Sequence, residues 1–171
     1  MKHLLTLTDE DVFKNSKNMP TDNFYKRRAA RAVVCGNKGE VYLLKMSTHN
    51  YHKLPGGGVD NGESLEDALY RELLEEIGCP AKVKKEVGEI VEYRNDENMH
   101  QTSYCYIAEQ TGALGETALE EGEIEEGAET VIAENLNEAI SLLENDRPTS
   151  YEGHFIQKRD LRFLREAKSI V

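Results

Sequence analysis

The sequence contains no apolar run that approaches the roughly 20 residues needed to cross a bilayer. Its opening, Met1 to Thr6, turns acidic at Asp9 instead of continuing into the apolar core of a signal peptide. We therefore expect a soluble, unexported protein of the cytoplasm that has no membrane partner.

Cysteine is scarce and unpaired. The three cysteines, Cys35, Cys79 and Cys105, are widely separated, and none belongs to a Cys-x-x-Cys pair or has a nearby histidine partner. This spacing indicates neither a disulfide framework nor a zinc site. We expect reduced thiols that fill apolar space.

Basic residues are outnumbered. The chain has 21 Lys and Arg against 32 Asp and Glu, which gives a formal net charge of -11 at pH 7. Nonspecific affinity for nucleic acid comes mainly from clustered Lys and Arg, so we expect no nucleic-acid polymer as a partner. An acidic protein can still act on phosphates if metal ions supply the positive charge.

The 171 residues, 39% of them hydrophobic, are enough for one compact domain with a real core and too few for two independent domains. We expect a single domain over residues 1–171, with a polar N-terminal extension over residues 1–20 and a C-terminal helix over residues 151–171. No repeat or low-complexity linker divides the chain.

Sequence periodicity predicts the order of the secondary-structure elements. β-Rich runs on both sides of Gly36 to Gly39 predict a hairpin within residues 31–46. Leucines at helical spacing predict one helix that begins at Ser64 and ends at a C-terminal cap on Gly78. Further strands are predicted over residues 86–94 and 102–109, a loop over 116–129, a short strand over 131–133, and helices over 135–146 and 152–170.

This order predicts an α+β fold, an α/β/α sandwich around a mixed β-sheet. The strands do not alternate regularly with helices, so a doubly wound nucleotide-binding fold is disfavoured. The glycine fingerprint with which such folds bind phosphate is also missing before the central helix.

The central helix carries three glutamates on one face. Glu72, Glu75 and Glu76 are spaced i, i+3 and i+4, and at about 100° per residue their side chains project together. Like charges at this spacing destabilise a helix by roughly 0.2 to 0.5 kcal/mol per pair. One interpretation is a solvated acidic face, and the other is a site that holds cations.

A glycine-rich loop leads directly into this helix. Gly56 to Gly58 cost backbone entropy, which is justified where the chain turns tightly or approaches a ligand closely. Ser64 can cap the helix, with Asp67 at the reciprocal position three residues on. The loop, the helix N-terminus and the carboxylates are thus held together, which favours the cation site.

The stretch from Gly57 to Cys79 resembles the signature of the Nudix hydrolases. That signature reads Gly, five residues, Glu, seven residues, Arg-Glu, an apolar residue, any residue, Glu-Glu, any residue, Gly and an apolar residue. Every fixed position is filled here, by Gly57, Glu63, Arg71, Glu72, Leu73, Glu75, Glu76, Gly78 and Cys79. The predicted order of strands and helices is also similar to the Nudix fold, a mixed sheet between helices.

The resemblance implies an enzyme, a pyrophosphohydrolase that cleaves a nucleoside diphosphate linked to another group. It implies Mg²⁺, or Mn²⁺, as the cofactor. It assigns the metal ligands to Glu72, Glu75 and Glu76, with help from Glu63 and from the carbonyl of Gly56. Hard divalent cations prefer such oxygen ligands, and they offset charge on phosphates and activate water.

The general base varies within this family. One alternative is the first glutamate of the Arg-Glu pair, here Glu72 oriented by Arg71, which we favour. The other is a glutamate on a later loop, where Glu121 and Glu123 are candidates for a base or a metal ligand. Glu120, Glu125 and Glu126 lie in the same acidic segment, and a solvated loop is the alternative interpretation for most of these residues.

The substrate is indicated by residues outside the signature. The basic stretch from Tyr25 to Arg31 and the glycine loop resemble small bacterial Nudix proteins that act on nucleoside triphosphates or oxidised nucleotides, which are our expected substrates. Arg28, Arg31 and Lys53, with Arg27, are candidate phosphate ligands. ADP-ribose and nucleotide sugars remain alternatives, and a homodimer is the family-level expectation.

Three further alternatives stay open. A tyrosine after the signature resembles a dinucleoside polyphosphate pattern, and Tyr93, Tyr104 and Tyr106 are available, although we favour ordinary strand tyrosines as their explanation. A Nudix fold can also serve as a nucleotide-binding sensor without catalysis, which the intact glutamate set argues against. A structural protein with an acidic helix would lose nothing on Glu72→Gln and Glu76→Gln.

Overall fold

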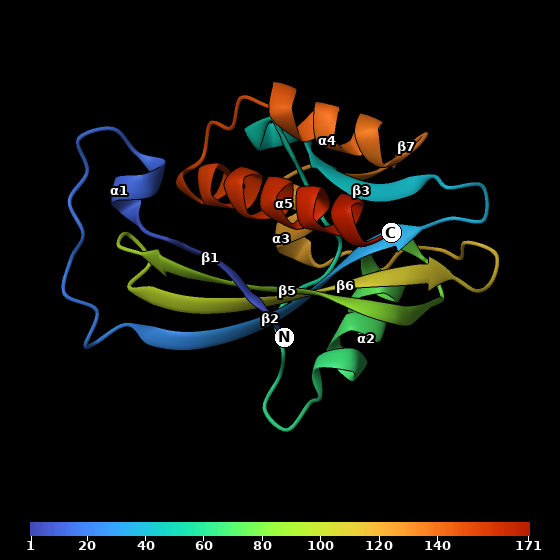
Figure 1. Ribbon diagram of the computed structural model, residues 1–171, viewed down its shortest axis with the longest axis horizontal. Helices are drawn as coiled ribbons and strands as arrows, with labels where there is room; N and C mark the ends of the chain where they lie inside the picture. The colour runs from blue at the N-terminus through green and yellow to red at the C-terminus, as the bar shows by residue number, and fades with distance from the viewer.

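The computed structural model describes residues 1–171 as a seven-stranded mixed sheet with helices on both faces. Figure 1 shows α4 (Leu136–Asn145) and α5 (Tyr151–Ile170) on one face of the sheet and α2 (Leu65–Ile77) on the other. This arrangement confirms the predicted α+β fold with α/β/α layers. None of the helices combines the length and the apolar character that crossing a membrane requires.

The sheet is mixed because two of its strand pairs are parallel. In spatial order the strands are β1 (His3–Leu7), β5 (Ala81–Arg94), β6 (Met99–Gln110), β2 (Tyr25–Cys35), β3 (Val41–Met46) and β4 (Tyr51–Lys53), and β7 (Ala128–Ala133) pairs with β3. β1 is parallel to β5, β2 is parallel to β6, and the other pairs are antiparallel. The parallel pairing places Arg27 beside Gln101 and Arg31 beside Cys105.

The hairpin and the central helix are confirmed. β2 and β3 pair antiparallel across the predicted glycine turn. The Ser64 hydroxyl accepts a hydrogen bond from Asp67 N at 3.1 Å, and Gly78 ends α2 in the left-handed conformation with φ +59°. The two caps therefore fix where the glutamate face of α2 begins and ends.

Two segments differ from the sequence-based prediction. The first residues are more than a polar extension, because β1 joins the sheet beside β5, buries Leu7 and is followed by α1 (Asp9–Val12). The acidic residues 116–129 are not a loop throughout, because they contain α3 (Glu121–Glu125) and the start of β7. β4 and the 3₁₀ helix Ser47–His49 were not predicted. All of these elements are too short to show a clear period in the sequence.

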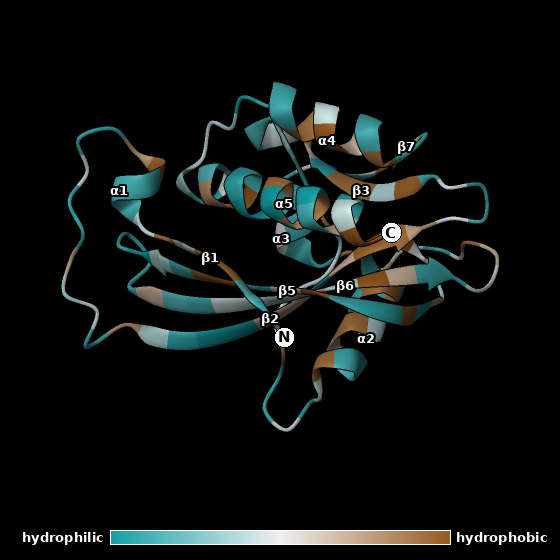
Figure 2. Cartoon of the chain, in the orientation of Figure 1, coloured by the Kyte–Doolittle hydropathy of each residue, from teal (hydrophilic) through white to brown (hydrophobic).

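Alternate side chains of β2 pack into the two apolar layers, one on each face of the sheet. On the α2 face, Ala30 packs with Leu69 and Leu73, and on the α5 face Val33 packs with Phe155. Each fully buried leucine contributes about 1.5 to 3 kcal/mol relative to an exposed one. Figure 2 shows the outward turns of α4 and α5 as largely hydrophilic and β3 as largely hydrophobic.

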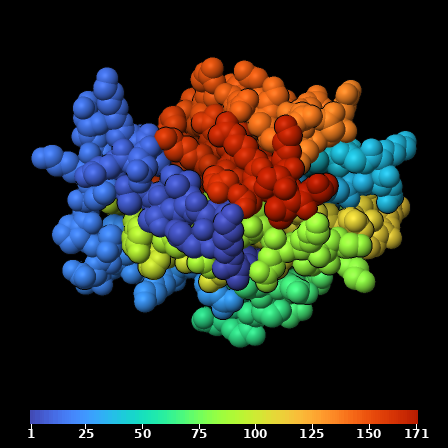
Figure 3. Space-filling model, in the orientation of Figure 1, coloured from blue at the N-terminus to red at the C-terminus, as the bar shows by residue number.

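The two ends of the chain pack side by side on the α5 face, as Figure 3 shows for the N-terminal segment and the C-terminal helix. Lys2 Nζ donates to Glu166 Oε1 at 2.8 Å, and Lys158 Nζ donates to the backbone oxygen of Asp11 at 2.7 Å. α5 therefore holds β1 and α1 against the rest of the molecule.

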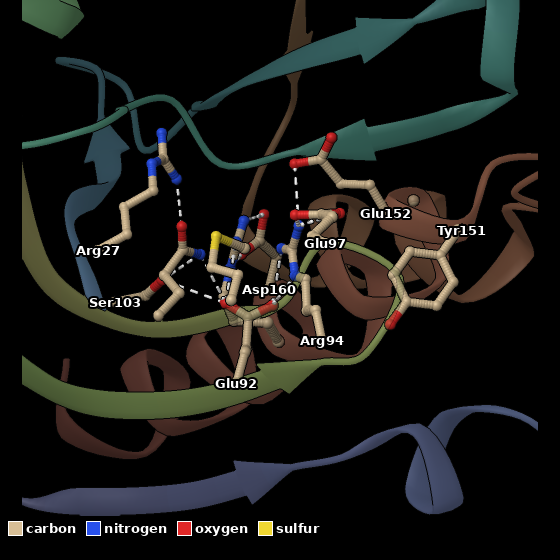
Figure 4. Close-up of polar contacts among 12 residues, drawn as sticks. Arg27, Glu92, Arg94, Glu97, Ser103, Tyr151, Glu152 and Asp160 are labelled. Carbon is tan, nitrogen blue, oxygen red and sulfur yellow. Dashed lines mark hydrogen bonds and ion pairs between the residues drawn. The ribbon is translucent and has the colours of Figure 1, made fainter. Parts of the chain in front are cut away.

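A buried polar network lies between the sheet and α5 (Figure 4). Glu92, Arg159 and Asp160 are completely buried. Glu92 accepts hydrogen bonds from Arg94 Nη2 at 2.9 Å, Gln101 Nε2 at 2.8 Å and Arg159 Nη1 at 3.4 Å. Arg159 Nε also donates to Asp160 Oδ1 at 2.7 Å. Each of these buried charges is thus paired, and loss of one partner would leave the other uncompensated.

We expect the contribution of Glu92 to stability to depend on pH. Burial alone would raise the pKa of Glu92, but Arg94 and Arg159 lower it to about 2, from an ordinary value of 4.5. The ionised carboxylate therefore stabilises the fold fully above about pH 4.5, and this contribution is lost as the pH falls toward 2. Glu92→Gln should lower the free energy of unfolding by about 3 kcal/mol at pH 7. Urea unfolding of the wild type and the variant at several pH values measures the difference in unfolding free energy, which should shrink in acid. A difference that stays constant with pH would contradict the low pKa of Glu92.

Candidate active site

A cleft of about 470 Å³ opens between α2, β2, the glycine loop, α3 and the first turn of α5. Only four of its 21 lining residues are hydrophobic, so it suits a charged, hydrated ligand. Its charged lining residues are Arg27, Arg28, Arg31, Lys53, Asp60, Arg71, Glu72, Glu75, Glu76, Glu120, Glu123, Glu126 and Glu152.

The glycine loop runs beside β2 and forms backbone hydrogen bonds with it. Ala30 N donates to Gly57 O at 3.0 Å, and Ala32 N donates to Pro55 O at 3.1 Å. Gly56, between these two acceptors, has φ +124°, and a Cβ atom there would lie 2.1 Å from Ala30 O. Only glycine fits this position, which explains why the loop needs it.

Glu76 links this loop to α2 through a hydrogen bond. Its side chain is 1% exposed, and its two oxygens accept hydrogen bonds from Gly56 N and, at 2.8 Å, from Lys53 Nζ. Burial raises the pKa of Glu76 to about 7, although Lys53 opposes the shift. The negative charge of ionised Glu76 is therefore only partly compensated, and a further cation at this place would stabilise it.

Arg71 forms hydrogen bonds with the remaining carboxylates of the signature. Its Nη1 donates to Glu72 Oε1 at 2.7 Å and to Glu75 Oε2 at 3.2 Å, and its Nη2 donates to Glu63 Oε2 at 3.0 Å and to Gly58 O at 3.1 Å. Glu72 also lies against Gly57, where a Cβ atom would be 2.4 Å from the carboxylate. Arg71 thus orients Glu72 toward the loop, and Glu63 holds Arg71 from outside the cleft.

No group of three or more His, Cys, Asp or Glu side chains is close enough together to hold a metal ion as it stands. The donor chemistry nonetheless fits a hard divalent cation. Glu72, Glu75 and Glu76 share one helix face, and the nearby Gly56 oxygen accepts no hydrogen bond. Carboxylate and carbonyl oxygens are the ligands that Mg²⁺ and Mn²⁺ prefer.

α3 brings one of the later glutamates into the cleft. Glu123 Oε1 accepts from Lys53 Nζ at 3.3 Å, so Lys53 bridges Glu123 and Glu76. Glu120 and Glu126 line the same wall, whereas Glu121 is exposed and lies outside the cleft. Of the two later-segment candidates, the structure brings only Glu123 to the α2 carboxylates.

The candidate phosphate ligands all line the cleft, in different environments. Arg28 is exposed, and its guanidinium lies 6.0 Å from the centre of the Tyr104 ring. Lys53 is paired with Glu76, and Arg27 Nη1 donates to Gln101. Arg31 is 6% exposed and lies beside the glycine loop.

Two residues that sequence reasoning missed connect α5 with the site. Glu152, at the start of α5, lines the cleft and pairs with Arg94 at 3.1 Å. Asp160 Oδ2 accepts from the backbone N–H of Leu54 at 2.8 Å, so the buried polar network reaches the start of the glycine loop. No local signal marks them, because their role depends on how α5 packs on the sheet.

Comparisons with known proteins support the fold. A family profile described as the NUDIX domain matches residues 25–152. An RNA pyrophosphohydrolase of Vibrio cholerae is 44% identical over 50 residues, a match that covers 29% of this chain and 29% of that protein's length.

Solved structures share the fold at low sequence identity. A NUDIX hydrolase from Nitrosomonas europaea is 14% identical with a TM-score of 0.65, and the match covers 85% of this chain and 90% of that one. An ADP-ribose pyrophosphatase from Streptococcus suis is 18% identical with a TM-score of 0.54, and the match covers 83% of this chain and 91% of that one. These structural similarities show that the chain shares the fold of these proteins.

Gly56→Ala tests the packing of the glycine loop. The new Cβ atom would meet Ala30 O, and the backbone would keep a positive φ, so we expect a loss of unfolding free energy at least about 2 kcal/mol larger than for Gly62→Ala. Gly62 is the matched control, because its φ of +85° is also positive while nothing lies within 4 Å of the added atom. Urea unfolding measures both; equal losses would mean that the loop is not confined by β2.

Proposed function

The chain belongs to the Nudix hydrolase family, and we propose that it hydrolyses a diphosphate bond in a nucleoside diphosphate linked to another group. Nucleoside triphosphates and oxidised nucleotides are the proposed substrate class. The observation that carries the proposal is the cleft, in which the α2 carboxylates Glu72, Glu75 and Glu76 form one wall and Arg31 lies on the β2 side. Cation-binding and anion-binding groups facing one space suit a metal-bound diphosphate.

Mg²⁺ or Mn²⁺ is the proposed cofactor. Glu72, Glu75, Glu76 and the Gly56 carbonyl are its proposed ligands, and Glu63 acts through Arg71. When bound, the cation offsets negative charge on the phosphates and acidifies a coordinated water. The protein's own contribution is to hold these oxygens in place: Arg71 orients Glu72 and Glu75, and the backbone of Gly56 fixes Glu76.

Glu72 is the proposed general base. Arg71 fixes its carboxylate at 2.7 Å, and burial raises the pKa of Glu72 although Arg71 opposes the shift. Glu123 is the competing candidate because it shares the cleft. We expect Glu72→Gln to lower kcat at least about a hundredfold and Glu123→Gln less than about tenfold, as measured by initial rates with Mg²⁺. The opposite order would assign the base to α3.

The related proteins broaden the range of substrates to be tested. The names RNA pyrophosphohydrolase and ADP-ribose pyrophosphatase make a phosphorylated RNA end and ADP-ribose alternative substrates for this chain. The net charge of -11 weighs against a long contact with RNA. Tyr93, Tyr104 and Tyr106 are absent from the cleft lining, which weighs against the dinucleoside polyphosphate alternative.

A substrate panel tests the proposed function. The panel contains nucleoside triphosphates, oxidised nucleotides, ADP-ribose, a nucleotide sugar, a diadenosine polyphosphate and a 5′-triphosphate RNA, each incubated with Mg²⁺ and analysed by chromatography of the products. We expect the fastest turnover with a nucleoside triphosphate or an oxidised nucleotide. Exclusive turnover of another member assigns that alternative, and tight binding without any turnover indicates a sensor.

Glu76→Gln tests the metal assignment. Loss of one anionic oxygen should lower kcat at least about a hundredfold while the protein stays folded. Glu66→Gln is the matched control, because Glu66 is exposed on the same helix and lies outside the cleft. Its kcat should stay within about twofold of the wild-type value, since it touches nothing in the site. Near-normal turnover of the Glu76 variant would remove Glu76 from the metal site.

A further inference from the structure

Asp160 is a fully buried carboxylate in the polar network beneath the cleft (Figure 4). Its Oδ1 accepts a hydrogen bond from Arg159 Nε at 2.7 Å, and its Oδ2 accepts from Arg159 Nη2 at 3.2 Å and from Leu54 N at 2.8 Å. The Leu54 amide is the one donor to Asp160 that lies outside α5. Through this bond, α5 holds the backbone at the start of the glycine loop.

The Leu54 amide takes its acceptor from another element of the fold. Leu54 is fully buried and comes directly after β4, whose pairing with β3 ends at Lys53. β2 holds the loop farther along, at the carbonyl oxygens of Pro55 and Gly57. A buried N–H group without an acceptor is costly, so the position of Leu54 depends on Asp160.

Leu54 lies between two contacts to Glu76. Lys53, one residue before it, donates from Nζ to Glu76 at 2.8 Å, and Gly56, two residues after it, donates from its backbone N–H. The carbonyl oxygen of Gly56 accepts no hydrogen bond in the protein and is a proposed cation ligand. A shift of Leu54 would therefore move the Gly56 oxygen together with the donors that orient the Glu76 carboxylate.

We propose that Asp160 is a positioning residue for the cation site: by holding Leu54 N, it keeps the Gly56 backbone at Glu76 and so sets the affinity for a divalent cation. This inference rests on the proposed function for the cation itself. Loss of a group that holds a metal ligand in place typically lowers metal affinity roughly 10- to 100-fold. The ion pair of Asp160 with Arg159 satisfies buried charges within α5, whereas the bond to Leu54 reaches the site.

Two double variants separate the hydrogen bond to Leu54 from the buried ion pair. Arg159→Met/Asp160→Leu removes both charges and the acceptor, whereas Arg159→Met/Asp160→Asn removes both charges but keeps an amide oxygen for Leu54 N. Replacing both members of the pair avoids the cost of one uncompensated buried charge, and Glu92 keeps its hydrogen bond from Arg94. Leu and Asn are similar in size, so the two variants differ chiefly in the acceptor.

Mn²⁺ binding without nucleotide, followed by the electron paramagnetic resonance of free Mn²⁺, measures the cation site without turnover. The Leu variant should bind Mn²⁺ at least about tenfold more weakly than the wild type, and the Asn variant within about threefold of it. In the metal-free proteins, hydrogen exchange of the Gly56 amide, measured by NMR, should be faster in the Leu variant than in the Asn variant.

Glu92→Gln is the control for a weakened buried network. Glu92 pairs with Arg159 but does not contact the glycine loop. The variant should lose stability while its Mn²⁺ affinity stays within about threefold of the wild-type value, because the bond from Leu54 to Asp160 is kept. A tenfold loss of Mn²⁺ affinity in this control would mean that the network as a whole, and not the hydrogen bond, sets the affinity.

The two double variants decide the proposal. Equal weakening in both would assign the effect to the buried charges, and unchanged Mn²⁺ binding in the Leu variant would mean that β2 alone positions the loop; either result overturns the proposal. If the Leu variant does not fold, the Asn variant decides. Near-wild-type Mn²⁺ binding by the Asn variant supports the role of the hydrogen bond, and binding at least about tenfold weaker contradicts it.

The outcome is distinguishable from that of the proposed function. A wild type that binds no Mn²⁺ would reject both the proposed cofactor and the role of Asp160. Mn²⁺ binding that depends on the acceptor at position 160, in a protein that turns over no member of the substrate panel, would support the positioning role while rejecting the hydrolase activity.

Discussion

The contact between the Gly56 backbone and the buried Glu76 carboxylate joins the two halves of the site. Gly56 has no room for a side chain against β2, and Glu76 has almost no access to water, so neither group can move far without the other. This contact brings a loop that follows β2 to the acidic face of α2. The remaining features of the cleft, including Arg71, Lys53 and Glu123, are arranged around it.

The charges of the site are balanced on two levels. In the cleft, Lys53 and Arg71 hold carboxylates that a divalent cation can share, while Arg31 Nε has no hydrogen-bond partner. Beneath the cleft, Arg159 and Asp160 form a fully buried pair, and Asp160 also binds the backbone of the residue that begins the loop. The deeper charges are satisfied within the protein, as stability requires, whereas the cleft charges are left for ligands.

The sequence predicted what depends on local spacing. The hairpin turn, the caps at Ser64 and Gly78, and the shared face of Glu72, Glu75 and Glu76 follow from neighbouring residues, and the structure has all of them. It did not predict that β1 joins the sheet, that α3 interrupts the acidic segment, or that Glu123 rather than Glu121 enters the cleft. These features depend on tertiary packing between residues far apart in the chain, which spacing does not encode.

The most direct test is a crystal structure of the protein with Mn²⁺ and a nucleoside triphosphate analogue whose phosphates are joined by methylene bridges. The anomalous signal of Mn²⁺ should lie within bonding distance of the Glu72 and Glu76 carboxylates. The phosphates should lie between that ion and the β2 wall, with an oxygen on the Arg31 guanidinium. An ion bound elsewhere, or phosphates outside the cleft, would contradict the assignment of this site.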